Sequence, residues 1–235
     1  MDLDSTFCLF SGKYAYEQEK LVAAQIETIC LGPLDVNCYI VGCPEHMSCA
    51  VFDPGDSAAR ILGTIENAKW SVANIINTHG HADHTGANHK LASSTQAPLS
   101  IHRLDRDLLT NHEMKEMAGY LGLAPSPEPD ILLEDGDDVA VCECISFKVI
   151  HTPGHSPGGA CFHHADFVIS GDTIFRMSIG RSDLPGGNHE TLIRSIRDKL
   201  FSLPDDTRIF PGHGDPTTIG YEKKNNPFVM NAFFR

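Results

Sequence analysis

Three histidines and one aspartate fall within six residues, in the segment Thr-His-Gly-His-Ala-Asp-His at residues 78–84. Imidazole and carboxylate groups are ligands that zinc, iron and manganese all accept. His79 and His81 are two residues apart, so an extended loop projects both side chains to the same side. Asp83 and His84 are adjacent and point in different directions. The segment therefore predicts ligands for two neighbouring metal ions.

Three further candidate ligands each follow a predicted strand: His155 in Pro-Gly-His-Ser, Asp172 in Ser-Gly-Asp-Thr and His213 in Pro-Gly-His-Gly. His151 stands at a strand end, where we expect a structural hydrogen bond instead. The seven ligands divide into two groups that share Asp172 as a bridge. The two groups are His79, His81 and His155 for one ion, and Asp83, His84 and His213 for the other. The first group has three histidines, an arrangement that leaves one position on the metal open for water.

A site that holds two divalent ions indicates a hydrolytic mechanism. Metal binding lowers the pKa of water to about 7, which makes hydroxide available at neutral pH. A metal-bridging hydroxide would then attack a substrate carbonyl, and Asp83 is the predicted catalytic residue that orients it. The first ion would polarise the carbonyl oxygen. The motifs contain no obvious Ser or Cys nucleophile, in agreement with attack by hydroxide.

Five charged residues are candidates for supporting roles. Asp53 either orients a ligand histidine or is a turn residue at a strand end. Arg181 and Asp183 form an internal ion pair that shapes the site loop, or contact the substrate directly. Lys223 and Lys224 either reach a substrate carboxylate or form a solvated surface pair.

The periodicity of apolar residues predicts strands and helices that interleave in two halves, residues 36–121 and 131–213. The predicted strands are 36–41, 50–52, 75–76, 99–101, 139–141, 145–150, 160–162, 167–170 and 208–210. The predicted helices are 57–69 with Asp56 or Ser57 as cap, 84–95, 103–121, and one that Asn188 caps. Two sheets packed face to face with helices outside form an α+β, four-layer αββα sandwich. We expect a single domain over residues 1–235 with its core at about 30–215, after a charged lead-in at 1–20.

Composition narrows the classes of partner. The chain has 235 residues and a formal charge of −13, without the clustered Lys and Arg that nucleic acid requires. No segment approaches the roughly 18 apolar residues of a membrane span. The eight cysteines include no C-x-x-C pair and are expected to be buried, reduced thiols. These features predict a cytoplasmic protein with a small-molecule substrate and no nucleic-acid or membrane partner.

The four ligand motifs, in this order, resemble the metallo-β-lactamase superfamily over roughly residues 30–215. The later segments at 171–175, 180–187 and 211–218, and the tail Asn226-Pro227-Phe228, are similar to the short, single-domain glyoxalase II-like hydrolases. The resemblance implies the αββα fold and a thioesterase that cleaves S-lactoylglutathione. Longer glyoxalase II enzymes hold glutathione with a C-terminal helical domain, whereas only 22 residues follow His213 here.

Other activities use the same ligands. One alternative is a lactonase or ester hydrolase on the same dinuclear site. Another is an iron persulfide dioxygenase with a single iron held by His79, His155 and Asp172, and a third is an inactive metal-binding protein. For the hydrolase we expect two zinc ions, with iron or manganese also acceptable to these ligands.

Overall fold

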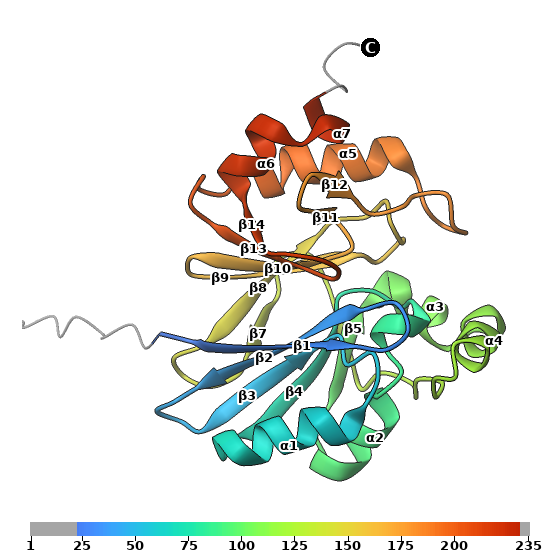
Figure 1. Cartoon of the computed structure of the whole chain (residues 1–235), viewed down its shortest axis with the longest axis vertical. Helices are drawn as coiled ribbons and strands as arrows, with labels where there is room; N and C mark the ends of the chain where they lie inside the picture. Colours follow the sequence, from blue (N-terminus) through green and yellow to red (C-terminus); the bar gives the residue numbers. More distant parts are fainter. Residues whose placement is uncertain (1–22, 231–235) are drawn as a thin grey trace, which may run out of the picture.

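The computed structural model describes residues 23–230 and shows two sheets packed face to face, with helices on both outer surfaces (Figure 1). The predicted four-layer αββα sandwich is therefore confirmed. The predicted lead-in at residues 1–20 lies outside the described residues. Within residues 23–230, no helix is long and apolar enough to cross a membrane.

The first sheet contains the N-terminal strands in sequence order, antiparallel from β1 to β3 and parallel from β3 to β6. Its outer face is covered by α1 (Ala58–Ala68) and α2 (Asn88–Thr95), whose Ile61, Ile65 and Leu91 are buried against it. The strands are β1 (Gln25–Leu31), β2 (Val36–Cys43), β3 (Ser48–Phe52), β4 (Ser71–Asn77), β5 (Leu99–His102) and β6 (Ile131–Leu133).

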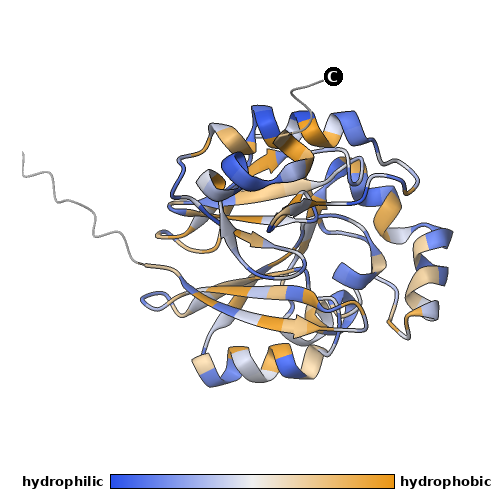
Figure 2. Cartoon of the chain, turned by 45° about the horizontal axis from the view of Figure 1, so that its top comes forward, coloured by the Kyte–Doolittle hydropathy of each residue, from blue (hydrophilic) through white to orange (hydrophobic). Residues whose placement is uncertain are grey.

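The second sheet has the order β14-β13-β10-β9-β8-β7. Its strands are β7 (Asp138–Ala140), β8 (Ser146–His151), β9 (Ala160–His164), β10 (Phe167–Gly171), β13 (Arg208–Pro211) and β14 (Thr217–Thr218). Its outer face is covered by α5 (His189–Asp198), η3 (Leu200–Ser202), α6 (Ile219–Asn225) and α7 (Pro227–Met230). These outer helices carry both hydrophobic and hydrophilic residues, as an amphipathic layer requires (Figure 2). A small ribbon of β11 (Ile174–Phe175) and β12 (Ser178–Ile179) follows β10.

The core between the two sheets is built on aromatic side chains. Phe52 of the first sheet packs edge-to-face on Phe147 and Phe162 of the second, with ring centroids 4.9 and 5.3 Å apart. All three rings are completely buried. Such pairs contribute beyond the area that they bury, so these rings fix how one sheet sits on the other.

Strand ends from both sheets meet at one edge of the sandwich. The loop after β4 accepts a hydrogen bond at the Thr78 carbonyl from the Ala160 N–H (2.9 Å) at the start of β9. The start of β2 reaches the end of β13, where the Asn37 N–H donates to the Gly212 carbonyl (2.7 Å). The polar motifs therefore share one edge although they are far apart in the sequence.

Several predicted elements differ in detail. The helix predicted over 103–121 is three pieces, η2 (Arg103–Asp105), α3 (Arg106–Thr110) and α4 (His112–Tyr120). It breaks at Asn111, whose side chain accepts from the Met114 N–H and so begins a new helix. The helix predicted over 84–95 begins at Asn88, after the short turn η1 (Ala82–His84).

The helix caps had different outcomes. Asn188 caps α5, as predicted, by accepting from the Thr191 N–H. Ser57 precedes α1 with φ +48° and makes no side-chain cap. Strands β1, β6 and β14 and helices α6 and α7 were not anticipated from the sequence pattern.

We predict that Phe52→Ala lowers the free energy of unfolding by about 3–5 kcal/mol, because it leaves a cavity between the sheets. Urea unfolding of wild type and variant at equal metal loading measures this difference. Tyr120→Ala is the matched control, since that ring is 88% exposed and should change stability by less than about 0.5 kcal/mol. A cost below about 1 kcal/mol for Phe52→Ala would contradict this role.

Candidate metal centre

The loops 78–84 and 151–159 bring three imidazole rings together. His155 Nε2 lies 2.9 Å from His81 Nδ1 and 3.2 Å from His79 Nε2. All three rings are buried. The structure thus gathers the first predicted group of ligands around one point.

The second predicted group is gathered beside the first. His84 Nε2 lies 3.3 Å from His213 Nε2 and 3.6 Å from Asp83 Oδ2. Asp83 Oδ2 is also 3.4 Å from His213 Nε2. Gly212 leaves room for this approach, because a Cβ there would collide with Asp172 and the His84 ring.

Asp172 lies between the two groups. Its Oδ1 is 3.4 Å from His84 Nε2, and its Oδ2 is 3.6 Å from His155 Nε2 and 3.7 Å from His213 Nε2. One carboxylate therefore faces ligands of both groups, as the bridging assignment requires.

The electrostatics of this cluster favour a bound cation. Burial, together with His84 and His155, holds the pKa of His79 well below its usual value, and burial with His155 lowers the pKa of His81 to about 3. These rings are neutral, which is the form that binds metal. Asp172 Oδ1 is buried without a hydrogen-bond partner among the described residues. Burial lowers the pKa of His84, but Asp83, Asp172 and Asp53 outweigh it and raise that pKa to about 10. The carboxylates thus favour positive charge on the ring beside them, and one of their oxygens lacks a hydrogen-bond partner among the described residues, so the cluster suits divalent cations.

Backbone carbonyls set the orientation of two rings. His155 Nδ1 donates to the Arg181 carbonyl (2.7 Å), and His213 Nδ1 donates to the Leu34 carbonyl (2.9 Å). In each ring the remaining nitrogen, Nε2, then carries a lone pair directed at the cluster. Such partners fix the tautomer of a metal-binding histidine.

Asp53 orients two more rings from behind. It is buried at the end of β3, and it accepts from the Thr78 N–H and hydroxyl, both at 2.7 Å. The Thr78 hydroxyl lies 3.1 Å from His79 Nδ1, and Asp53 Oδ2 lies 3.1 Å from His84 Nδ1. Nδ1 of His79 thus faces a hydroxyl and Nδ1 of His84 faces a carboxylate in an ion pair, while the Nε2 atoms of both rings face the cluster. This geometry favours the orienting role over that of a turn residue.

Arg181 and Asp183 form a two-pronged ion pair with both N–O distances at 2.9 Å. The hydrogen bonds from Arg181 hold the pKa of Asp183 near 2. The pair is exposed, whereas the Arg181 carbonyl holds His155. The geometry favours a loop-shaping role, although Arg181 also lines the pocket beside the cluster.

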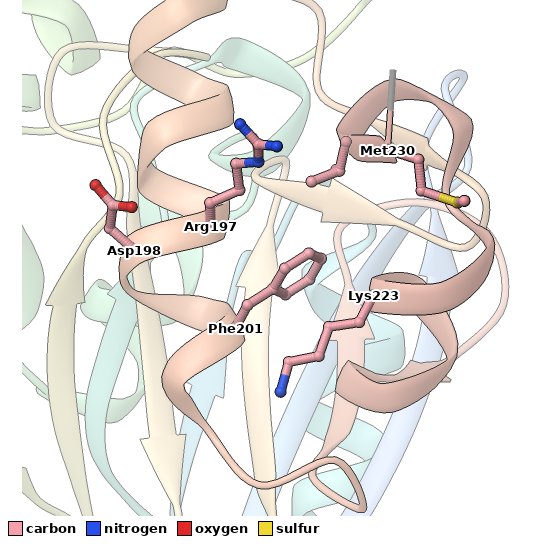
Figure 3. A pocket seen from close by; sticks show the side chains of 6 residues that line it. Arg197, Asp198, Phe201, Lys223 and Met230 are labelled. Carbon is pink, nitrogen blue, oxygen red and sulfur yellow. The ribbon is translucent and has the colours of Figure 1, made fainter. Parts of the chain in front are cut away.

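Lys223 and Lys224 do not lie at the metal cluster, contrary to the suggestion that they reach a substrate. Lys223 extends along Phe201 in a different pocket, between α5 and the C-terminal helices (Figure 3). Its ammonium pairs with Asp205 at 2.6 Å. Helix α6 packs on the outer face of the second sheet, and neither lysine lines the pocket at the metal cluster.

Asp105 belongs to the site but was not anticipated. It is fully buried after β5 and accepts from the Gly80 N–H (3.0 Å), the Ser156 hydroxyl (2.7 Å) and the Gly158 N–H. It therefore ties the loop of His79 and His81 to the loop of His155. No ligand motif surrounds Asp105 in the sequence. His151, by contrast, makes the predicted structural hydrogen bond, to the Pro157 carbonyl at 2.9 Å.

A pocket of about 290 Å³ opens onto the cluster. Ligands of both groups form its floor, and Leu34, Arg181, Glu113 and the mainly apolar side chains of α3, α4 and the 184–185 loop form its walls. No Ser, Thr or Cys lines it. The pocket therefore suits a small, partly apolar substrate and offers no hydroxyl or thiol nucleophile.

Comparison with known proteins gives the family. The sequence matches the profile of the Metallo-beta-lactamase superfamily over residues 31–213, which contain all seven candidate ligands. The chain belongs to this superfamily. Members of the superfamily similar to this chain include the Probable metallo-hydrolase YqgX of Bacillus subtilis, 34% identical over 86% of this chain and 96% of that protein. The Hydroxyacylglutathione hydrolase GloC of Haemophilus influenzae is 35% identical over 87% of this chain and 97% of that protein.

Solved structures agree with this membership. The BLEG-1 B3 metallo-beta-lactamase is 32% identical and superposes with a TM-score of 0.81 over 87% of this chain and 99% of that one. TTHA1623, solved in a di-iron-bound form, is 38% identical with a TM-score of 0.77 over 86% and 99% of the two chains. The superfamily, whose members are mostly hydrolases, and the His/Asp cluster together support divalent metal ions in this chain.

We predict that Asp53→Asn weakens zinc binding by about 10–100-fold, the usual effect of losing a partner that orients a ligand. An amide presents a donor to His84 or to Thr78, so one of the two rings loses its fixed tautomer. Zinc competition against a chromophoric chelator measures the affinity. Asp166→Asn, which changes an exposed carboxylate that pairs with Arg208 and has no contact with the ligands, is the control and should bind zinc like wild type. Equal affinities in all three proteins would show that Asp53 does not orient the ligands.

Proposed function

We propose that this chain is a thioesterase of the glyoxalase II type, which cleaves S-lactoylglutathione or a related thioester into an acid and a thiol. The observation that carries the proposal is the apolar pocket whose floor is the His/Asp cluster and whose walls hold no Ser, Thr or Cys. Without such a side chain, the attacking group is water. The similarity to GloC, whose name describes this activity, supports the substrate class.

The seven residues are proposed to hold two divalent ions, zinc in the first instance, in the groups described above. When bound, such ions supply Lewis acidity and lower the pKa of water. Burial would raise the pKa of Asp83, but His84, His213 and His81 lower it below its usual range. Asp83 is therefore an ionised acceptor at the pocket floor, where it can hold and orient the water that attacks the carbonyl.

The pocket walls position the substrate. Leu108, Met114, Met117 and Leu184 exclude bulk water from the acyl group, which strengthens electrostatic interactions at the floor. The leaving thiolate is stable enough to depart without a proton donor. No Lys or Tyr that could serve as one lines the pocket.

Binding of the glutathione part is expected to be weak. Glutathione carries two carboxylates, and the pocket offers one cation, Arg181, which is already paired with Asp183. Glu113 adds a negative charge to the same wall. Weak binding of the glutathione part, equal in the ground state and the transition state, raises KM and leaves the chemical step unchanged. We therefore expect kcat to be sustained at high substrate concentration.

We predict that zinc-loaded protein cleaves S-lactoylglutathione and consumes no oxygen when glutathione persulfide is added. Loss of thioester absorbance and an oxygen electrode, used on the same sample, provide both readings. Asp172→Ala should lower kcat/KM by more than the roughly 10–100-fold typical of outer partners, whereas His151→Ala should stay within that range.

Three outcomes would redirect the assignment. Oxygen uptake by an iron-loaded form, with the zinc form inactive on thioesters, would favour the persulfide dioxygenase. Hydrolysis of small lactones with no thioester cleavage would favour the lactonase. Equal, mild losses in the two variants would show that Asp172 is not a ligand.

A further inference from the structure

Three side chains that could ligate a metal, with a further thiol beside them, gather at the opposite end of the molecule from the His/Asp cluster. They are Cys43, at the end of β2, His46, in the β2–β3 turn, and Cys142 and Cys144, in the β7–β8 turn. Strand β2 begins at Val36, which bridges to His213, and Cys43 lies seven residues further along. At about 3.3 Å per residue, the two sites are roughly 23 Å apart. No residue is common to the two sites.

The distances are those of a metal site. Ligand atoms of Cys43, His46 and Cys144 all lie within 4.8 Å of one another. Cys43 Sγ is 3.4 Å from His46 Nδ1. Tetrahedral zinc, with Zn–S near 2.3 Å and Zn–N near 2.0–2.1 Å, places S and N about 3.6 Å apart. The thiols of Cys142 and Cys144 each also interact with that of Cys43.

The three thiols have different environments, and only that of Cys43 favours thiolate. Burial raises the pKa of Cys43, but hydrogen bonds from the His46 and Glu45 backbone and from neighbouring side chains lower it to about 7. Burial raises the pKa of Cys142 despite backbone hydrogen bonds from Cys144 and Ile145, and burial and Cys43 raise the pKa of Cys144. Cys43 is completely buried, whereas His46 is exposed and the other two thiols are half-buried. An ion can therefore reach the cluster from solvent. The sequence predicted buried, reduced thiols, and only Cys43 of these three is buried.

We propose that Cys43, His46 and Cys144, with the neighbouring thiol of Cys142 as the fourth ligand, form a second metal site that takes a thiolate-preferring ion such as zinc. Three thiolates and one imidazole form a ligand set typical of structural zinc, with all four positions filled by protein. Binding releases the thiol protons to solvent. The site joins the first sheet to the second, at the edge where Ser48 Oγ already donates to the Val141 carbonyl at 3.0 Å. The ion is a cross-link between the sheets.

Cobalt provides a selective probe of this site. Thiolate bound to Co²⁺ gives an intense near-ultraviolet charge-transfer band, whereas the other centre offers only imidazole and carboxylate. The experiment titrates Co²⁺ into full-length, metal-stripped protein that has been reduced with a phosphine. We expect the band to grow to a plateau and to be abolished by zinc.

Three variants test the assignment of the ligands. Cys144→Ser and His46→Gln should each weaken the cobalt affinity read from the band by at least about 10-fold, since even outer partners have effects of that size. Cys30→Ser, which removes an exposed thiol on β1, should leave the affinity unchanged. Because His46 is exposed, His46→Gln keeps the fold, and far-ultraviolet circular dichroism checks each variant.

The absence of a thiolate band in the reduced wild type would overturn the proposal. A band that persists at wild-type affinity in both Cys144→Ser and His46→Gln, or one that Cys30→Ser abolishes, would also overturn it. These outcomes do not depend on the thioesterase activity.

Discussion

Ring nitrogens and carboxylate oxygens crowd into one small buried volume in this protein, and that arrangement requires positive charge between them. His155 Nε2 is within 3.2 Å of nitrogens on two other imidazoles. Lone pairs at such separations repel each other unless a cation or protons lie between them. Asp172 adds a buried oxygen that has no partner among the described residues. The hydrogen bonds around the cluster are explained by this need for cations.

The fold meets this requirement by holding the rings from behind. Asp53 and Asp105 are both buried carboxylates, and neither belongs to the predicted ligand set. Asp53 fixes Thr78 and His84 within one loop, whereas Asp105 ties that loop to the one that carries His155. The two sheets bring their strand ends to a common edge. Asp53 and Asp105 then fix the positions of the imidazole rings on the loops at that edge. Their energetic cost of burial is offset by the hydrogen bonds that each carboxylate accepts.

The ligand motifs could be found from sequence because metal binding demands particular residue types. His79, His81, Asp83 and His84 stand so close together that their chemistry is visible without a fold. His155, Asp172 and His213 can be identified as ligands because each follows a predicted strand and because they occur in this order along the chain. Asp105 could not be found in this way, because an acidic residue after a strand is common and its partners lie 25 and 51 residues away. The choice between the two roles offered for Lys223 stayed open for a similar reason. Its distance from the site depends on how α6 packs, which local pattern does not specify.

The layered fold was also predictable, because apolar periodicity distinguishes helices from strands in both halves. The boundaries of the helices and strands were less predictable. The break at Asn111 depends on one side-chain hydrogen bond, and β6 has two exposed residues in three. Clustering of Cys43 with Cys144 likewise depends on two turns, from different sheets, that meet only in the folded molecule.

Anomalous diffraction at the zinc edge, from crystals of zinc-loaded protein, tests the central claim most directly. The account predicts two peaks at the His/Asp cluster. One should contact His79, His81 and His155, the other Asp83, His84 and His213, and Asp172 should contact both. A single peak in this cluster at full occupancy, or two peaks with Asp172 turned away from both, would contradict it.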